Sequence, residues 1–304
     1  MRIIFIFIDG IGLGEENENN PFSYCTTPGI SKLLNGKQLV EATVGFQGSI
    51  ASLFGLDALL NVPGAPQSAT GQASIFTGVN AAKFLGRHLN GFPNDRLRKL
   101  LALKGIYSRI KINGYKPNFI NAYRPQFFDL LNKGLPGNRY SCSTLISYYG
   151  GLHFHSLNDI LNGRALYMDI TNEVLNRMGF NLPLLTPDEA AFRLAGISKS
   201  YDFSLFEYFL SDLAGHLGDR EEAARVVSVL DRFIVNLADQ INYEDTLIVV
   251  ASDHGNLEDI STKGHTLNMV PALIIGNESV RQLLEASLVS LTDLFPAFCK
   301  ILEL

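Results

Sequence analysis

Short apolar runs alternate with amphipathic patterns along most of the chain. The first run, Arg2 to Ile8, is apolar at every position after the arginine, which is typical of a strand buried on both faces of a sheet. Further runs of this kind span Phe203 to Leu210, Thr246 to Ala251 and Val270 to Ile275. Strands separated by helical patterns favour an α/β fold, with a mostly parallel sheet and helices on both of its faces.

Helical patterns fill several of the intervals between these runs. The clearest extends from Glu221 to Ile241, where apolar residues recur at helical spacing behind an acidic first turn. Helices are also predicted at residues 26–34, from Ser68 onward, at residues 103–111 with Gly114 as the stop, and at residues 294–304. Residues 118–122 are predicted to form another strand.

The stretch from residue 123 to about residue 200 breaks this rhythm. It is rich in Tyr, Gly and Asn and lacks regular alternation of strand and helix. We therefore interpret residues 123–200 as a small inserted cap or lid, and residues 1–122 and 201–304 as one α/β core domain. His153 and His155 alternate as on a strand, and we interpret them as cap surface or cap core rather than metal ligands.

Composition narrows the classes of function. The 304 residues are 46% hydrophobic, which is enough for a large buried core, and 25 basic against 30 acidic residues give a net charge of −5. No basic run suggests a nucleic-acid or anionic-membrane partner. The three cysteines are far apart and no apolar segment has transmembrane length, so we expect a cytoplasmic protein without disulfides. The oligomeric state stays open.

Metal-ligand side chains follow the apolar runs. Asp9 closes the first run, Asp212 and His216 follow the run at 203–210, Asp253 and His254 follow that at 246–251, and His265 precedes the last. Because open α/β sheets bind ligands at the carboxyl ends of their strands, the three aspartates should meet at one edge.

Three carboxylates at one place would repel one another unless cations lay between them. Two divalent cations would leave a site charge of about +1 with neutral imidazoles, which suits an anionic ester. A metal pair about 3.5 to 4 Å apart can stabilise both the attacking and the leaving oxygen of an in-line displacement, so phosphoryl transfer is the natural candidate. Mixed Asp and His ligands suit Zn²⁺ or Mn²⁺.

A nucleophile is available in the segment from Pro66 to Gly78. Ser68 lies at a predicted helix start, where a hydroxyl meets free backbone N–H groups that also suit a phosphate. Thr70 is a rival nucleophile two residues on, and Ser68 could also be only a helix cap. Arg87 and Asn90 are candidates for substrate contacts, because Arg can clamp a phosphate and Asn can donate to an oxyanion; a solvated loop is the alternative.

In combination these residues resemble the alkaline phosphatase superfamily, which includes cofactor-independent phosphoglycerate mutase and phosphopentomutase. The resemblance covers most of the chain and rests on the order of Asp9, Ser68 with Thr77-Gly78, the D-x-x-x-H and D-H pairs, and His265. It implies that Ser68 is phosphorylated. It also implies one metal held by Asp212, His216 and His265, and another held by Asp9, Ser68, Asp253 and His254.

The sequence departs from two branches of that superfamily. Mutases usually have a His directly after the glycine three residues beyond the nucleophile, and Gln72 occupies that place. Sulfatases carry x-Pro-x-Arg after the nucleophile, and Ala69-Thr70-Gly71-Gln72 stands there instead. The main prediction is therefore a two-metal enzyme that hydrolyses a small-molecule phosphate ester, with a mutase or a non-catalytic metal-binding relative as alternatives. A nucleotide-binding loop after Asp9 is disfavoured, because Glu15 occupies the third glycine position of GxGxxG.

Overall fold

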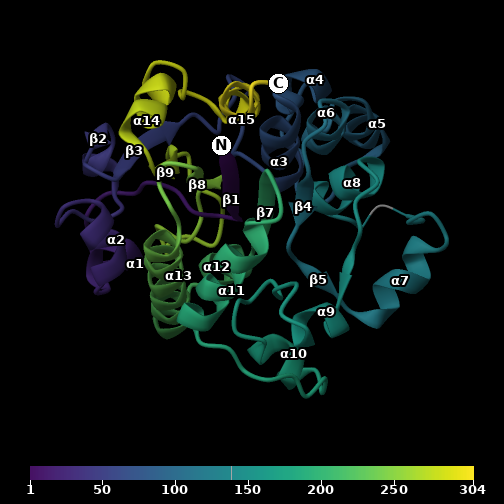
Figure 1. The fold of residues 1–304 in the computed structure, drawn as a ribbon. Coiled ribbons are helices and arrows are strands. Elements are labelled where there is room, and N and C mark those ends of the chain that lie inside the picture. The colour runs from purple at the N-terminus through teal and green to yellow at the C-terminus, as the bar shows by residue number, and fades with distance from the viewer. Residues whose placement is uncertain (138) are drawn as a thin grey trace.

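The centre of the molecule is a seven-stranded sheet, seen in a computed structural model that describes residues 1–137 and 139–304 (Figure 1). Its strand order is β2-β3-β9-β8-β1-β7-β4. β1 pairs in parallel with both β7 and β8, and β4 pairs in parallel with β7, while β9 is antiparallel to β3 and β8. The bounds are β1 Arg2–Ile8, β2 Phe46–Gln47, β3 Ala51–Leu56, β4 Pro117–Phe119, β7 Phe203–Tyr208, β8 Thr246–Ser252 and β9 Val270–Ile275.

The alternation of side chains in β1 divides the core into two layers. Phe5 and Phe7 point into one hydrophobic cluster, and Ile4 and Ile6 point into the other, because successive side chains of a strand face opposite sides. Both faces of the sheet are therefore covered, as the continuous apolar run at residues 3–8 predicts. The predicted α/β class with a mostly parallel sheet and helices on both faces is confirmed.

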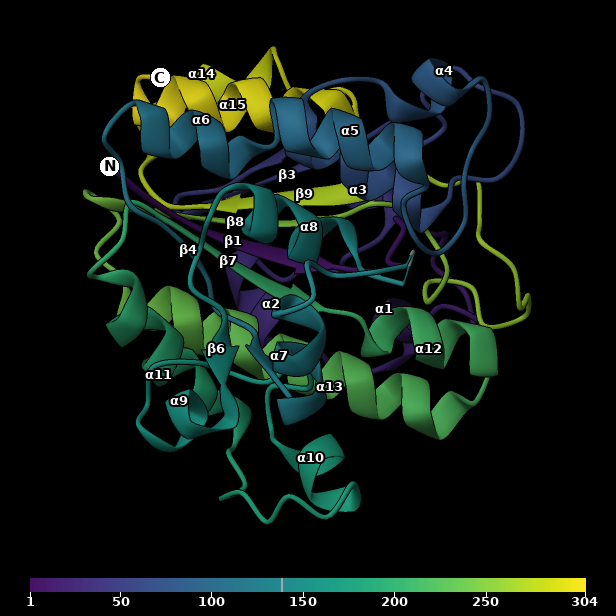
Figure 2. The same ribbon diagram turned by 90° about the vertical axis from the view of Figure 1, so that its right-hand side faces the viewer.

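One face of the sheet is covered by helices from the first half and the C-terminal end of the chain (Figure 2). The Phe5 ring packs 4.9 Å from the Phe298 ring and 6.4 Å from the Phe76 ring, measured between centroids, so aromatic contacts join α15 and α3 to the sheet. The helices of this side are α3 Ser68–Thr77, α4 Ala81–Leu85, α5 Asp95–Lys104, α6 Ile106–Ile112, α8 Cys142–Tyr149, α14 Glu278–Glu285 and α15 Leu294–Leu302.

The opposite face packs against α13, the longest helix, and its neighbours (Figure 2). α13 buries Val226, Leu230, Phe233 and Leu237 along one stripe, and Asp219 caps its first turn by accepting a hydrogen bond from the Glu222 N–H at 2.8 Å. This confirms the helix predicted at residues 221–241. The helices on this side are α1 Pro21–Tyr24, α2 Pro28–Leu33, α11 Pro187–Ser198, α12 Leu210–Leu217 and α13 Arg220–Gln240.

The segment predicted to be an inserted cap contributes to three parts of the molecule. Its helix α8 packs in the core layer of α3, α5 and α6, and its helix α11 packs in the layer of α13. The remainder carries a two-stranded sheet and a small hydrophobic cluster of its own around Ile160 and Leu175, at the edge of the molecule in Figure 1. The division into core and cap stays a prediction. The elements of this remainder are β5 Ala122–Tyr123, α7 Pro125–Leu131, β6 His155–Ser156, α9 Leu157–Leu161 and α10 Glu173–Arg177.

Three predicted elements differ from the structure in their bounds. The helix predicted at residues 103–111 belongs to two helices, because Gly105 adopts φ −58° and ψ 138° and so interrupts the helical hydrogen bonds. The strand predicted at 118–122 divides between β4 and β5. The strand predicted to extend to Leu210 ends at Tyr208, and Asp212 lies in the first turn of α12 rather than directly after a strand.

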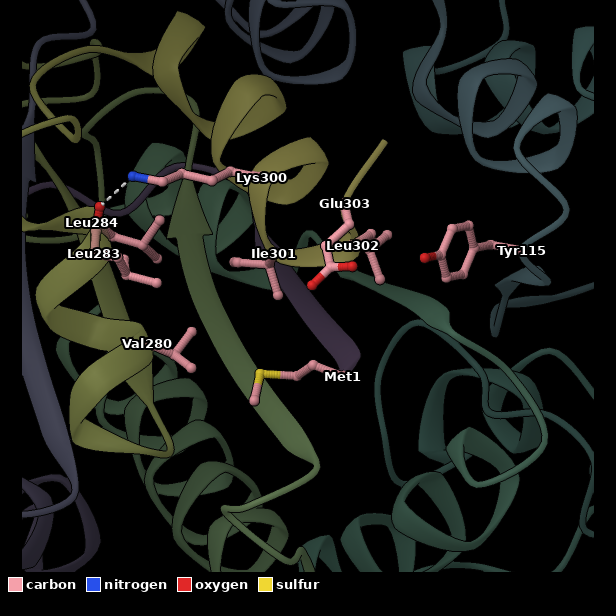
Figure 3. A pocket seen from close by; sticks show the side chains of 9 residues that line it. All are labelled: Met1, Tyr115, Val280, Leu283, Leu284, Lys300, Ile301, Leu302 and Glu303. Carbon is pink, nitrogen blue, oxygen red and sulfur yellow. Dashed lines mark hydrogen bonds between the residues drawn. The ribbon is translucent and has the colours of Figure 1, made fainter.

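A hollow of about 280 Å³ lies at the end of the sheet where β1 begins, between α14, α15 and Met1 (Figure 3). Its wall is apolar apart from Tyr115, Lys300 and Glu303, and it contains none of the predicted metal ligands. Asp9 follows the other end of β1, so this hollow is remote from the predicted chemistry. Among the described residues, no helix has the length and apolarity needed to cross a membrane.

Candidate metal centre

Asp9, Asp253 and His254 form one group of side chains, here named the Asp9 cluster. Asp9 directly follows β1 and Asp253 directly follows β8, and these strands are paired neighbours. Each residue offers a ligand atom within 4.8 Å of the others. The parallel pairing thus brings together two carboxylates that are far apart in sequence, at the strand ends where they were expected.

The Asp9 cluster contains buried carboxylate oxygens with few polar partners. Apart from the imidazole of His254, the described residues offer no polar partner to Oδ1 of Asp9 or Oδ2 of Asp253. His254 Nε2 lies 3.1 Å from Asp9 Oδ1 and 3.8 Å from Asp253 Oδ2. Buried carboxylate oxygens are costly unless they are paired or bound to a cation, so this donor set fits a divalent metal ion.

Asp212, His216 and His265 form a second group, here named the Asp212 cluster. Asp212 and His216 are one turn apart on α12, so their side chains share a face of the helix, and His216 Nε2 lies 3.3 Å from Asp212 Oδ2. His265 comes from the loop before β9, and its Nε2 lies 3.7 Å from Asp212 Oδ1. The fold therefore closes a set of three ligand atoms from two distant segments.

Backbone carbonyls orient both imidazoles of the Asp212 cluster. His216 Nδ1 contacts the Lys263 carbonyl at 2.7 Å, and His265 Nδ1 contacts the Pro66 carbonyl at 2.7 Å. A carbonyl only accepts, so each Nδ1 carries the proton and leaves Nε2 of the neutral ring free as a ligand. This arrangement is common for metal-binding histidines. The Asp212 cluster therefore also offers a donor set that fits a divalent metal ion.

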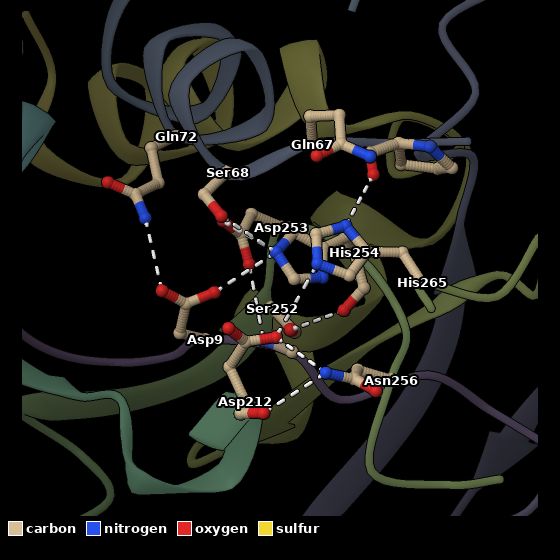
Figure 4. Close-up of polar contacts among 12 residues, drawn as sticks. Asp9, Gln67, Ser68, Gln72, Asp212, Ser252, Asp253, His254, Asn256 and His265 are labelled. Carbon is tan, nitrogen blue, oxygen red and sulfur yellow. Dashed lines mark hydrogen bonds and ion pairs between the residues drawn. The ribbon is translucent and has the colours of Figure 1, made fainter. Parts of the chain in front are cut away.

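The two clusters are in direct contact (Figure 4). The rings of His254 and His265 stack with centroids 3.7 Å apart and an angle of 11° between their planes. Ser68, at the first position of α3, places its Oγ 3.0 Å from His254 Nε2. The structure thus brings together all seven residues for which metal contact was predicted: Asp9, Ser68, Asp212, His216, Asp253, His254 and His265.

The charges within the site favour bound positive charge. Burial raises the pKa of the Asp253 carboxyl, and the nearby Asp9 raises that pKa further. Burial lowers the pKa of His254, but the carboxylates of Asp253 and Asp9 outweigh burial and raise the pKa to about 10. Burial and the neighbouring His254 lower the pKa of His265. A region that is dominated by buried carboxylates is an electrostatic trap for cations.

The hydroxyl groups of Ser68 and Thr70 have different surroundings. Ser68 Oγ faces His254, whereas Thr70 Oγ1 donates to the Gln67 carbonyl at 3.1 Å and accepts from the Leu89 N–H at 3.2 Å. Both hydrogen bonds of the Thr70 hydroxyl are therefore to backbone groups. Gln72, one turn after Ser68, donates from Nε2 to Asp9 Oδ2 at 3.4 Å and so also faces the Asp9 cluster.

Arg87 and Asn90 lie on the exposed loop after α4. Within residues 1–137 and 139–304, neither side chain makes a hydrogen bond or ion pair with either cluster, although the Leu89–Thr70 hydrogen bond anchors this loop beside the first turn of α3. Their predicted role in substrate binding stays a prediction. His155 is buried and its Nε2 contacts Asn118 Oδ1 at 3.0 Å, while His153 is exposed.

Two buried residues that hold the site together were not predicted. Asn256 donates from Nδ2 to Asp212 Oδ1 at 2.8 Å and to the Asp212 carbonyl at 3.1 Å. Glu258 accepts from the Gly12 and Asn256 N–H groups, both at 2.8 Å, and from the Thr266 hydroxyl. Glu258 thus ties the loop after β1 to the loop after β8. Asn256 could have been predicted from the sequence, because it is a polar residue that closely follows the two predicted ligands Asp253 and His254.

Glu207, a buried acid on β7, leads us to predict a pH effect on stability. Burial raises the pKa of Glu207 from an ordinary value of 4.5 to about 7, although the Ser143 hydroxyl opposes this by donating to Oε2 at 2.6 Å. A carboxyl whose pKa is raised by folding favours the folded state at low pH and costs stability as pH rises from about 4.5 to about 7. Relative to Glu207→Gln, the wild type should lose about 3 kcal/mol of unfolding free energy over that interval.

Urea denaturation of both proteins at pH 5, 6, 7 and 8 measures this difference. Subtracting the two curves removes the contribution of every group that titrates in both proteins. Parallel curves would contradict the raised pKa of Glu207.

Comparison with known families gives the site a context. Residues 188–304 match the sequence family described as the Metalloenzyme superfamily, and this segment contains Asp212, His216, Asp253, His254 and His265. Over these residues the chain is similar to the Metalloenzyme superfamily.

Curated relatives match this chain over a limited length. The 2,3-bisphosphoglycerate-independent phosphoglycerate mutase of Antithamnion sp. is 27% identical over 132 residues, which are 40% of this chain and 26% of that protein. The enzyme with the same name from Francisella tularensis is 30% identical over 112 residues, which are 34% of this chain and 22% of that protein. The matched region thus spans about a quarter of the length of these relatives.

Solved structures extend the structural similarity to nearly the whole chain. The PH0037 protein from Pyrococcus horikoshii aligns with a TM-score of 0.59 and 15% identity, covering 99% of this chain and 96% of that one. Leishmania mexicana phosphoglycerate mutase aligns with a TM-score of 0.54 and 11% identity, covering 99% and 95%. The alkaline phosphatase of the Antarctic bacterium TAB5 aligns with a TM-score of 0.51 and 12% identity, covering 99% of this chain and 98% of that one. At these identities the likeness concerns the fold, which is alkaline phosphatase-like.

Proposed function

We propose that this protein is a metal-dependent phosphotransfer enzyme that hydrolyses a small-molecule phosphate ester through a phosphorylated Ser68. In this proposal the Asp9 cluster together with Ser68 holds one divalent cation, and the Asp212 cluster holds a second. The Asp and His donor set suits Zn²⁺ or Mn²⁺. The observation that carries the proposal is the position of the Ser68 hydroxyl, 3.0 Å from His254 Nε2 at the junction of two ligand clusters.

The residues of the chain divide the reaction between them. Bound cations supply Lewis-acid stabilisation of anionic oxygens and lower the pKa of a coordinated hydroxyl. Ser68 releases its proton to solvent, and its Oγ forms a bond to phosphorus while the bond from phosphorus to the alcohol oxygen breaks. The alcohol leaves with a proton from solvent, and water then cleaves the phosphoserine to release phosphate and restore Ser68.

The start of α3 supports Ser68 as the nucleophile over Thr70. Ser68 is the first residue of this ten-residue helix, so backbone N–H groups of the first turn are available to a phosphate oxygen. The Thr70 hydroxyl is already bonded to two backbone groups, at Gln67 and Leu89, and would have to release both to attack.

A phosphomutase is the second candidate, because the curated relatives in both organisms carry a mutase name. A mutase returns the phosphoryl group to a hydroxyl of the substrate instead of to water. Gln72 faces Asp9, and its amide cannot act as a general acid or base at neutral pH. The superfamily's mutases are expected to have a histidine at this position. The choice between water and a substrate hydroxyl as acceptor therefore decides between the two functions.

Metal analysis combined with a substrate panel tests the proposal. The purified protein should contain about two equivalents of Zn²⁺ or Mn²⁺ per chain, and it should release phosphate from at least one of a panel of phosphomonoesters, phosphodiesters and sugar phosphates. Treatment with a chelator should abolish turnover, and the added metal should restore it. Phosphorus NMR with 3-phosphoglycerate distinguishes an isomerised ester from free phosphate and so separates mutase from hydrolase.

The outcomes separate the alternatives. Two bound metals without turnover of any ester would indicate a non-catalytic metal-binding relative. A protein that binds no divalent metal and still turns over an ester would overturn the two-metal scheme.

A further inference from the structure

An aromatic cavity of about 460 Å³ begins at the carboxyl end of β7, the strand paired with β1. Its wall combines residues of α7, α8, the two-stranded sheet and the carboxyl end of β7. This volume is within the range of pockets that hold small organic ligands. The aromatic rings of its wall are those of Phe92, Phe119, Tyr123, Phe127, Tyr140, Tyr167 and Phe209.

Contacts of the backbone connect this aromatic pocket to the nucleophile. Tyr208, between the wall residues Glu207 and Phe209, accepts a hydrogen bond from the Asp9 N–H at 2.9 Å. Cys142, at the start of α8, donates to the Ala69 carbonyl directly after Ser68 at 3.4 Å. The walls of the pocket are thus continuous with the segments that present Asp9 and Ser68.

The loop after α4 also connects the pocket to the first turn of α3. It contributes Phe92 to the pocket, and it is anchored by the Leu89 N–H to Thr70 in the first turn of α3. A phosphate ester bound at Ser68 therefore has the aromatic pocket next to it, where its alcohol part can lie.

The arrangement of rings in the pocket suits a flat aromatic group. Tyr123 and Phe127 stack with centroids 3.9 Å apart, and Phe119 and Tyr123 lie at 6.2 Å and tilted. Tyr123 OH is held by Thr144 Oγ1 at 2.7 Å, which fixes the ring plane. Rings fixed at stacking and edge distances attract another ring more strongly than an aliphatic chain of equal area.

The polar groups of the wall differ in burial: its carboxyl is buried and its arginines are exposed. Glu207 is buried, and Ser143 donates to its Oε2, while the guanidinium groups of Arg124 and Arg139 are on exposed residues. The arginines attract an anionic molecule, and the buried carboxyl offers an acceptor to an N–H or O–H group on the part of the ligand that enters the pocket.

We propose that this pocket binds an aromatic ring in the alcohol part of the phosphate ester, with Glu207 accepting a hydrogen bond from a donor group on that ring. The inference rests on the proposed function, because it assigns the substrate class of the same site. It selects esters of aromatic or heteroaromatic alcohols over esters of short aliphatic alcohols.

Phosphonates that cannot be hydrolysed test the pocket without relying on turnover. Titration calorimetry of the metal-loaded protein should give an affinity for benzylphosphonate at least about tenfold above that for methylphosphonate, because the ring is buried. Phe127→Ala, and separately Phe92→Ala at a ring that is 47% exposed, should each reduce this preference to about threefold or less. Both variants should leave the affinity for methylphosphonate within about twofold of wild type.

Phe192→Ala is the matched control. The Phe192 ring is on α11, is 69% exposed and is not part of the pocket wall, so its removal should leave the preference intact. Among the 2-, 3- and 4-hydroxybenzylphosphonates, at least one should bind about threefold to tenfold more tightly than benzylphosphonate. Glu207→Leu should remove this gain while the preference for the unsubstituted ring persists.

Equal affinities of the wild type for benzylphosphonate and methylphosphonate would overturn the pocket assignment, and ester turnover in the same preparation would show that the proposed function still holds. A preserved aromatic preference with no ester turnover would overturn the phosphotransfer proposal instead. If no hydroxylated ring gains affinity, the role of Glu207 is overturned.

Discussion

Ser68→Ala should reduce the kcat for 4-nitrophenyl phosphate by at least about a thousandfold, because the substitution removes the oxygen that attacks phosphorus. The metal content should stay at the wild-type level, since the carboxylate and imidazole ligands of both clusters are unchanged. Steady-state release of 4-nitrophenolate measures the rate, and elemental analysis of the same preparation measures the metals. Measuring both on one sample separates loss of the nucleophile from loss of the site.

Thr70→Ala is the matched control for this prediction. Thr70 is in the same helical turn and is also buried, but its hydroxyl is bonded to backbone groups. Its removal should change kcat by less than about tenfold. Full activity of Ser68→Ala together with an inactive Thr70→Ala would transfer the role of nucleophile to Thr70, and full activity of both variants would end the phosphoserine scheme.

Asp253→Asn should abolish turnover together with metal binding at the Asp9 cluster. Asn keeps the size of the side chain but removes the charge of a fully buried ligand, whose Oδ2 has no hydrogen-bond partner among the described residues. We expect the metal content to decrease from about two equivalents to about one or fewer per chain. Elemental analysis after dialysis, together with the phosphatase assay, checks this result.

Stability distinguishes loss of metal from unfolding in this variant. Asp253→Asn removes a buried negative charge that is repelled by Asp9, so the chelator-treated variant should unfold at a temperature no lower than the chelator-treated wild type. Asp239→Asn is the control, because Asp239 is an exposed acid paired with Lys32 at 2.8 Å and should affect neither metal content nor rate. An Asp253→Asn protein with two metals and wild-type kcat would contradict the assignment of the Asp9 cluster.

Some site residues could be predicted from local sequence patterns that do not depend on distant contacts. Asp9 and Asp253 directly follow buried apolar strands, and parallel strands bring their carboxyl ends to one edge. Asp212 and His216 were predicted as ligand types that follow the run at 203–210. That they share one face of α12 came from the structure, because the run was expected to continue as a strand to Leu210. Strand periodicity therefore predicted the positions of Asp9 and Asp253.

The residues that were missed depend on long-range packing. Glu207 is one position in an apolar strand, and nothing local indicates that its carboxyl is buried next to Ser143 of α8. Glu258 receives hydrogen bonds from Gly12, which is 246 positions away in sequence. Gly105 ends α5 by its backbone conformation, although the residues around it are good helix formers.

The sequence by itself determined the α/β class and the strand ends that carry Asp9 and Asp253, because strand and helix periods are properties of neighbouring residues. Only the tertiary structure decided that the rings of His254 and His265 stack at 3.7 Å, that Ser68 rather than Thr70 faces His254, and that an aromatic pocket adjoins them. These features depend on the crossing of loops from different strands, and their geometry is set by side-chain packing that no local pattern encodes.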